Sequence, residues 1–212
     1  MDKRFVITIN RHCGSGGGTI GRKIASKLGI NYYDKELIEF EDEDSSIDPS
    51  ALAQADERVK SSLYSRLYKN TYNGVLIDES DPDFDKYQEL FLRQAKAIRS
   101  IASSENCVVV GRCADFVLSD CEGRVSVFIT ADEKQCISGE MDRLSITNKE
   151  AKDRIRKINA YRRAYYLHHT GKVWDSPEHY DLFLSSSEHS YEECADIIIE
   201  YLNEISAKES SL

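Results

Sequence analysis

A glycine-dense turn between a β-rich segment and an amphipathic one constrains this chain more than any other feature. Residues 5–9 are β-rich, and five glycines follow between positions 14 and 21. Apolar residues then recur every four positions from Ile20 to Leu28, which predicts one apolar helix face, and Gly29 ends the helix. A second short strand is expected at 30–33. This order predicts a βαβ unit with parallel strands.

The rest of the chain continues the alternation of strands and helices. The segment 107–110 is fully apolar, as in strands of a sheet that is covered on both faces. No internal repeat and no interdomain linker is evident, so one α/β domain with a parallel sheet and helices on both sides is expected. Further strands are expected at 125–129 and 180–184, and helices at 51–69, 84–103, from 131, at 148–169 and at 191–205.

Composition and charge exclude several classes of protein. The chain carries 28 Lys and Arg against 37 Asp and Glu, a net charge of −9, which argues against a general nucleic-acid-binding protein. No segment approaches the roughly 18 apolar residues of a membrane helix, and the N-terminal apolar run is too short for a signal peptide. The six cysteines show no zinc-site spacing. We expect a cytoplasmic protein with reduced thiols, no metal site, and no nucleic-acid or membrane partner; a homo-oligomer is left open.

The glycine turn has a chemical use. Glycines let the backbone curl so that several N–H groups point inward at the positive end of a helix dipole, an arrangement that holds phosphate. The alternative is a tight turn that needs only positive φ angles. Because the turn has more glycines than that and follows the first strand, phosphate binding is favoured. The predicted phosphate-binding residues are Gly14, Ser15, Gly16, Gly17, Gly18 and Thr19.

Several short motifs follow one another along the chain. They are Ile9-Asn10-Arg11 with Gly14-Ser15-Gly16-Gly17, Tyr32-Tyr33-Asp34-Lys35-Glu36-Leu37-Ile38, Gly111-Arg112-Cys113-Ala114, Arg163-Ala164-Tyr165-Tyr166, Thr170-Gly171 with Trp174, and Tyr180-Asp181-Leu182. In this order and spacing they resemble the P-loop nucleoside monophosphate kinases, specifically the cytidylate kinase-like family. The resemblance implies a three-layer α/β P-loop NTPase fold with a parallel sheet, a helical acceptor-binding insert (34–103) and a basic lid (148–170), the core being 1–33, 104–147 and 171–212. It also implies transfer of the γ-phosphoryl group from ATP, with Mg²⁺, to a nucleoside monophosphate (CMP-like) or a related small acceptor.

The glycine loop departs from the standard P-loop pattern G-x-x-x-x-G-K-[ST]. In this register Arg11 replaces the first glycine, Gly17 the lysine and Gly18 the hydroxyl residue, and Thr19 follows one place later. The lysine normally neutralises phosphate oxygens, so its loss is an objection to ordinary turnover. Our hypothesis is that Arg11 supplies the missing charge from the other side of the loop, as a catalytic residue.

The resemblance also implies an acceptor site. Arg112 follows the apolar strand where cytidylate kinases carry Gly-Arg-Asp, and is expected to bind the acceptor phosphate; a structural ion pair is the alternative. Cys113 occupies the place of the aspartate that contacts the sugar, so recognition of the sugar does not carry over. Asp34 matches the start of the acceptor segment, although it also suits a helix N-cap.

The basic segment 149–163 resembles the lid that brings arginines over the transferred phosphate and excludes water. Arg154, Arg162 and Arg163 are the catalytic candidates there, and a solvated helix face is the alternative.

Two other functions remain open at this point. One is a regulatory protein that binds nucleotide or phosphate and has lost efficient catalysis, which Gly17 favours. The other is a dinucleotide-binding oxidoreductase, since Gly16, Gly18 and Gly21 match G-x-G-x-x-G and Asp34 lies near the place of its acidic residue.

Overall fold

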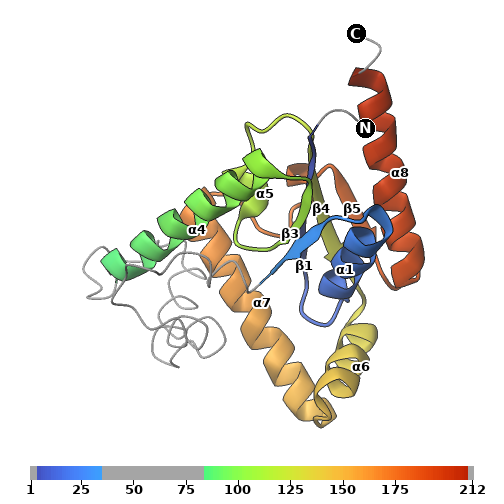
Figure 1. Cartoon of the computed structure of the whole chain (residues 1–212). Helices are drawn as coiled ribbons and strands as arrows, with labels where there is room; N and C mark the ends of the chain where they lie inside the picture. The colour runs from blue at the N-terminus through green and yellow to red at the C-terminus, as the bar shows by residue number, and fades with distance from the viewer. Residues whose placement is uncertain (1–3, 35–83, 210–212) are drawn as a thin grey trace.

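The computed structural model describes residues 4–34 and 84–209. The helix expected at 51–69, and most of the segment 34–103, lie outside these residues. The described part is an α/β structure in which a central sheet is covered on both faces by helices (Figure 1).

The described strands form a five-stranded parallel sheet with the order β2-β3-β1-β4-β5. Because β3 lies between β1 and β2, the order differs from that of the dinucleotide-binding fold, in which the first two strands are neighbours. The oxidoreductase alternative is therefore wrong at the level of topology. The strands are β1 (Val6–Arg11), β2 (Asn31–Tyr33), β3 (Cys107–Val110), β4 (Arg124–Thr130) and β5 (Leu182–Ser185).

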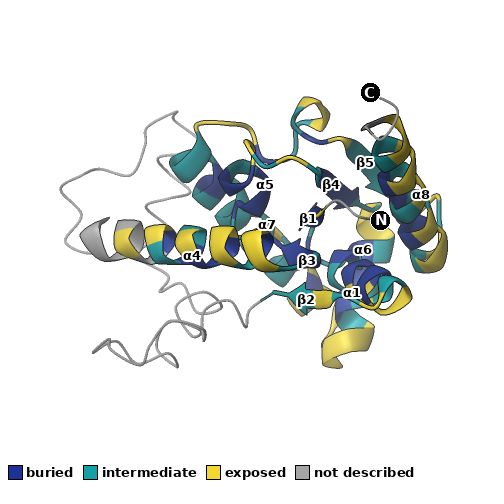
Figure 2. Cartoon of the chain, turned by 45° about the horizontal axis from the view of Figure 1, so that its top comes forward, coloured by how far each residue is buried: buried dark blue, intermediate teal, exposed yellow. Residues whose placement is uncertain are grey.

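The helices form the two outer layers. α1 and α8 cover one face of the sheet, and α4, α5 and α7 cover the other, so that the buried residues lie between the layers (Figure 2). No described helix is long and apolar enough to cross a membrane. The helices are α1 (Gly17–Leu28), α4 (Phe84–Ser104), α5 (Ala114–Val117), α6 (Glu133–Leu144), α7 (Asn148–Thr170) and α8 (Tyr191–Glu209), with a 3-10 turn at Pro177–His179.

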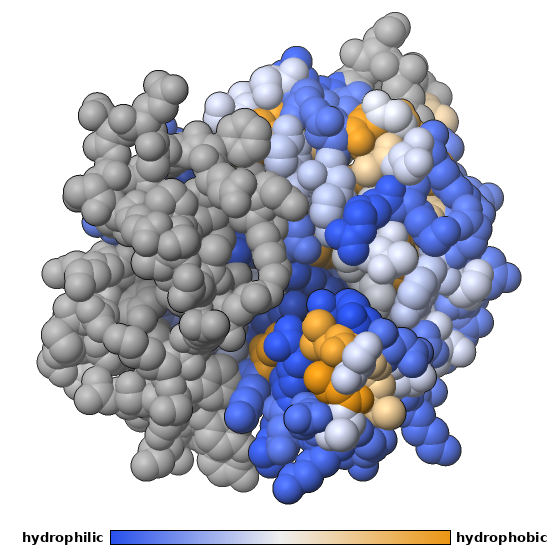
Figure 3. All heavy atoms as spheres, turned by 60° about the horizontal axis from the view of Figure 1, so that its bottom comes forward, coloured by the Kyte–Doolittle hydropathy of each residue, from blue (hydrophilic) through white to orange (hydrophobic). Residues whose placement is uncertain are grey.

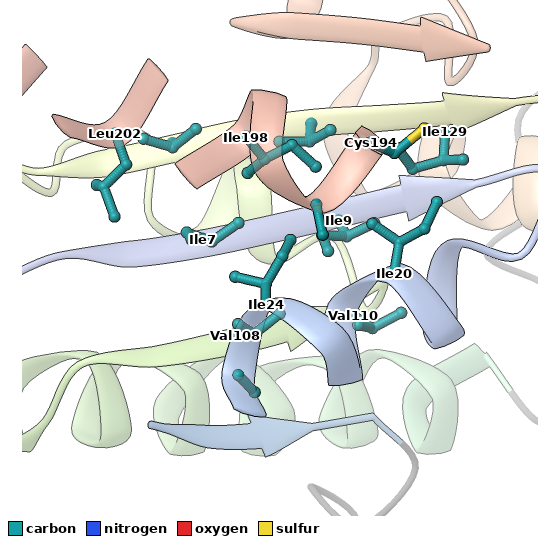
Figure 4. Close-up of a cluster of buried hydrophobic side chains, with 14 of the residues drawn as sticks. Ile7, Ile9, Ile20, Ile24, Val108, Val110, Ile129, Cys194, Ile198 and Leu202 are labelled. Atoms are coloured by element: carbon teal, nitrogen blue, oxygen red, sulfur yellow. The ribbon is translucent and has the colours of Figure 1, made fainter. Parts of the chain in front are cut away.

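The apolar stripe predicted for α1 is confirmed. Ile20 and Ile24 are fully buried and point at β1, and residues of α8 pack into the same cluster on the same face of the sheet (Figure 4). Gly29 ends the helix in the left-handed conformation with φ of 65°. This packing fixes the start of α1, and with it the glycine turn, against the carboxyl end of β1.

The alternation of side chains along β1 decides what the end of the strand can reach. Ile7 and Ile9 pack in the layer of α1 and α8. Arg11 faces the same side, with its Cβ beside Gly17 of α1. Asn10 points the other way and donates from Nδ2 to the Asp115 carboxylate of α5 (2.8 Å). The two neighbouring polar residues therefore serve opposite layers.

The segment expected to be a lid is one continuous helix, α7. It begins with a capping box between Thr147 and Glu150 and ends at Gly171, which has a φ of 68°. Its C-terminal half belongs to the core, since Tyr166 is 2% exposed. Its N-terminal half leaves the core and packs against α6.

The contact between α4 and α7 predicts a dependence of stability on pH. His169 stacks on Phe91 with 4.0 Å between ring centroids and 9° between planes. Burial, and secondarily His168, lowers the pKa of His169 to about 3. Below pH 6.5 the unfolded chain binds a proton that the folded protein excludes, so stability is lost as the pH falls towards 3. Urea unfolding should show that the free energy of unfolding falls by roughly 1–2 kcal/mol between pH 7 and pH 5 because of this group, allowing for partial exposure.

The variant His169→Phe keeps the stacked ring without the titrating group. It should remove this part of the dependence of the unfolding free energy on pH, and an unchanged dependence contradicts the prediction.

Candidate functional site

A cavity of about 1110 Å³ lies over the carboxyl ends of β1, β2 and β3. The carboxyl edge of a parallel sheet is where α/β proteins bind ligands. The cavity is walled by the glycine turn, the start of α1, α6 and the exposed side of α7. The surface on the side of α6 and the N-terminal part of α7 is mainly hydrophilic, with a small apolar cluster (Figure 3).

The cavity is basic although the chain is acidic. Among the described residues that line it, eight are Arg or Lys and three are Asp or Glu, against a net charge of −9 for the chain. A cavity that concentrates positive charge in this way raises the local concentration of anions. The basic residues are Arg11, Arg22, Arg112, Arg143, Arg154, Arg156, Lys157 and Arg162, and the acidic ones are Asp34, Glu140 and Asp142.

The glycine turn presents backbone N–H groups to this cavity. α1 begins at Gly17, its N-cap Gly16 is left-handed with φ of 78°, and no side chain caps the helix. The first N–H groups of a helix have no acceptor within it, so those at the start of α1 are available to an anion. The first turn contains no acidic residue. Of the six residues predicted to bind phosphate, all but Ser15 line the cavity.

Ser15 supports the turn from below. Its side chain is buried, and Oγ lies 2.9 Å from the carbonyl oxygen of His12 and 3.0 Å from that of Ile129. The backbone N–H of Cys13 donates to Oδ1 of Asn159 on α7 (2.8 Å). Tyr191, the first residue of α8, packs its ring over Gly16, where a Cβ would lie 2.3 Å from Cζ. The turn is thus held in place by contacts with the end of β4, with α7 and with the start of α8.

The end of β3 forms the second part of the cavity wall. Three consecutive residues, Gly111, Arg112 and Cys113, have positive φ angles of 79°, 58° and 53°. Non-glycine residues in this conformation are strained, and such strain concentrates at functional sites. The turn places Arg112 in the cavity wall, while Cys113 is 3% exposed. Burial raises the pKa of the Cys113 thiol well above its usual range, so this residue is neutral. By the sequence resemblance described above, it lies where cytidylate kinases carry an aspartate.

Asp34 and Arg11 meet at the end of β2. Arg11 Nη2 lies 3.3 Å from Asp34 Oδ1, and the Tyr32 hydroxyl donates to the other carboxylate oxygen (3.2 Å). Both residues line the cavity. The structure therefore brings the two predicted site residues together, from strands that are not adjacent in the sheet.

The three arginines predicted on the lid have different surroundings. Arg154 lines the cavity and donates from Nε to Glu140 (2.8 Å), and Arg162 lines it and donates from Nη1 to the carbonyl oxygen of Arg11 (2.9 Å). Arg163 does not line the cavity; its Nη2 lies 2.6 Å from Oδ2 of Asp175.

Two side chains at the site were missed by sequence reasoning. Glu140 is 4% exposed and binds both Arg143 and Arg154; burial acts to raise its pKa, but the two arginines lower it below the ordinary value. His12 lies between Thr130 Oγ1 (2.9 Å from Nδ1) and Asp175, and its hydrogen bond holds the pKa of that carboxyl well below its usual range. No motif marks either residue, because their partners come from β4, α6, α7 and the segment after α7.

A buried polar network lies beneath the cavity. Asp115 on α5 is 6% exposed and accepts hydrogen bonds from Asn10 (2.8 Å) and the Tyr166 hydroxyl (2.6 Å). Tyr180 accepts a second bond from Asn10 (3.2 Å) and donates to the carbonyl oxygen of Trp174 (2.5 Å). The network joins β1, α5, α7 and the segment before β5, and so fixes α7 relative to the glycine turn.

The sheet order and the glycine turn at the start of α1 define a protein with the P-loop kinase fold. The model of the cytidylate kinase-like family matches residues 6–188, and the chain belongs to that family. The predicted family and fold are thus confirmed. No curated protein matches the sequence.

Solved structures agree with this assignment at the level of the fold. An uncharacterized protein from Eubacterium ventriosum ATCC 27560 is 25% identical, with a TM-score of 0.69 over 94% of this chain and 99% of that one. A gluconokinase from Sinorhizobium meliloti 1021 is 13% identical, with a TM-score of 0.50 over 98% of each chain.

Proposed function

We propose that this protein transfers the γ-phosphoryl group of ATP to a small phosphorylated acceptor, a nucleoside monophosphate of the CMP type being the first candidate. The observation that carries the proposal is the basic cavity, whose wall contains both the glycine turn and Arg112. A phosphoryl transfer needs two anionic groups held near each other and a surplus of positive charge around them.

In this proposal the donor phosphates lie on the backbone N–H groups at the start of α1, between residues 14 and 19. Arg112 binds the acceptor phosphate, and Asp34 borders the same part of the cavity. Arg154 and Arg162 face the cavity from α7 and neutralise charge during transfer. Because Cys113 is buried and neutral, nothing at that position recognises a sugar hydroxyl as a carboxylate would, so both ribo- and deoxyribonucleotides are candidate acceptors.

The described residues fit a magnesium ion that arrives with the nucleotide. Among residues 4–34 and 84–209, no three His, Cys, Asp or Glu side chains gather as a metal site. Magnesium retains several water ligands and commonly takes one or two carboxylates together with substrate phosphates. The exposed Thr19 hydroxyl and the Asp34 carboxylate line the cavity and would hold it there. When bound, the ion neutralises phosphate oxygens.

The second candidate is a regulatory protein that binds nucleotide without efficient turnover. Gly17 at the position of the P-loop lysine is the observation that favours it, because the backbone cradle is retained while that cation is lost. The two candidates share the ligand and differ in the product.

Product analysis separates them. Near-stoichiometric protein is incubated with ATP, Mg²⁺ and each common nucleoside monophosphate in turn, CMP and dCMP included, and the nucleotides are separated by chromatography. We expect ADP and the diphosphate of one acceptor in equal amounts. Neither product should form in the matched incubation without acceptor. ATP binding without any product at that loading would contradict the kinase and support the regulatory protein.

A further inference from the structure

We propose that Arg11 and Gly17 have exchanged roles across the glycine turn: the phosphate-binding cation now comes from the end of β1, and residue 17 is glycine to leave room for it. The nature of the ligand rests on the function proposed above. The exchange itself is a statement about packing and charge that can be tested without any turnover.

The base of the Arg11 side chain occupies the space that a side chain at position 17 would need. A Cβ built on Gly17 would lie 2.5 Å from Cβ of Arg11 and 2.9 Å from its Cγ. The Arg11 Cβ is fixed by the backbone of β1, so it cannot rotate away as the end of a long side chain would, and Cγ can move only if the whole Arg11 side chain changes its χ1 rotamer. In the standard pattern the first position is glycine and the seventh is lysine, which avoids the same collision from the other side. At the first and seventh positions of the pattern, this chain therefore has Arg11 and Gly17 in place of glycine and lysine.

The tip of Arg11 is held just as closely. A Cβ at Gly111 would lie 2.3 Å from Arg11 Nη1, and Nη2 is 3.3 Å from the Asp34 carboxylate. Arg162 donates to the Arg11 carbonyl (2.9 Å), which holds its backbone. The side chain is only 17% exposed. Glycines at both ends and a carboxylate at the tip therefore keep it in one path, from the glycine turn to the ends of β3 and β2.

This path places the charge differently from a P-loop lysine. Gly111, against which the guanidinium lies, directly precedes Arg112, so the charge lies between the glycine turn and the proposed acceptor arginine. A planar guanidinium can bind two oxygens at once, which a lysine ammonium cannot do in a fixed geometry. Arg11 therefore contacts the donor phosphate that lies nearest to the acceptor. This phosphate competes with the Asp34 carboxylate for the Arg11 guanidinium.

Thermal unfolding of Gly17→Ala, Arg11→Gly and the double variant tests the exchange in packing. Gly17→Ala should lower Tm by about 5 °C in the presence of Arg11, since overpacking of this kind has to displace backbone-fixed atoms. In the Arg11→Gly background the same methyl group should cost less than about 1 °C. Gly18→Ala is the matched control, because its Cβ would approach the Tyr32 hydroxyl (3.3 Å) and not Arg11, so its effect should be equal in both backgrounds. An equal effect of Gly17→Ala in both backgrounds would overturn the exchange.

Calorimetric binding of sodium tripolyphosphate and of Mg²⁺–ATP tests the charge. Arg11→Ala should weaken both about 10- to 100-fold, as expected for loss of a charge-assisted hydrogen bond. Gly17→Lys alone should bind no better than wild type, whereas Arg11→Gly with Gly17→Lys should regain most of the affinity lost in Arg11→Gly. Arg99→Ala, on the outer surface of α4 and outside the cavity lining, is the control and should leave binding unchanged. Undiminished binding by Arg11→Ala would overturn the assignment.

Failure of the inference and failure of the proposed function are distinguishable. Binding that depends on Arg11, together with no phosphorylated product, would leave the exchange in place and remove the kinase. Full kinase activity in Arg11→Ala, with unchanged ATP affinity, would leave the kinase in place and remove the role of Arg11.

Discussion

Arg112→Ala is expected to lower kcat/KM for the acceptor about 100- to 1000-fold, while the KM for ATP changes by less than about twofold. Arg112 lies in the part of the cavity wall formed by the end of β3, whereas the glycine turn at the start of α1 is proposed to hold the donor. Its loss should therefore weaken contact with the acceptor phosphate and with the charge that develops during transfer. Steady-state kinetics with each substrate varied in turn measures the two effects separately.

The Arg112→Ala substitution should add no backbone strain. Arg112 already has a φ of 58°, and alanine pays the same strain there, so the variant changes the side chain without a new conformational cost. Arg112→Lys keeps one charge and should retain an intermediate activity. Arg99→Ala, an exposed arginine on α4 that pairs with Asp120, should behave as wild type. If Arg112→Ala raised the KM for ATP as much as that for the acceptor, the separation into donor and acceptor sides would be wrong.

The fold could be predicted from the sequence because its signals are local and repeated. The four-residue apolar period of α1 and the glycine after it fixed the helix, and the continuous apolar run of β3 indicated a sheet covered on both faces. The expected strand at 180–184 was placed two residues early, since Tyr180 and Asp181 instead bond to the core from the segment before β5. The G-x-G-x-x-G match was misleading, because glycine spacing does not encode strand order.

The candidate site was predictable only in part. The cavity contains the glycine turn, Asp34 and Arg112, each of which follows a strand or starts a helix at a place that sequence reasoning can locate. The partners of the lid arginines were not predictable, because the direction of a side chain on a 23-residue helix depends on packing against α6 and the core. Glu140 is the clearest example: one of many acidic residues in the sequence, it is buried between two arginines only in the folded chain.

The buried network under the cavity leads to the largest expected effect on stability. Asp115→Ala is expected to lower the free energy of unfolding at pH 7 by about 2–4 kcal/mol, because Asn10 and Tyr166 are left as buried donors without their acceptor. Since the network joins α5 and α7 to β1, the variant should also loosen the position of α7, and nucleotide affinity should fall with stability. Urea unfolding followed by circular dichroism measures the first effect, and calorimetry the second.

The charge of Asp115 can be separated from its hydrogen bonds by Asp115→Asn. Burial raises the pKa of Asp115 above its ordinary value, although Tyr166 and Asn10 oppose the shift. A raised pKa in the folded state means that ionisation costs stability above that pKa, and the cost disappears as the pH falls to the ordinary value. Asp115→Asn keeps an acceptor for Asn10 and offers an amide N–H to the Tyr166 oxygen, but the Tyr166 O–H, which donates to Asp115 in the wild type, loses its acceptor. Its stability at pH 7 should therefore lie between those of wild type and Asp115→Ala, and it should fall further behind wild type towards pH 4, where the ionisation cost of Asp115 disappears. An Asn variant as unstable as the Ala variant at pH 7 would show that the carboxylate itself, rather than a satisfied pair of hydrogen bonds, holds α7 in place.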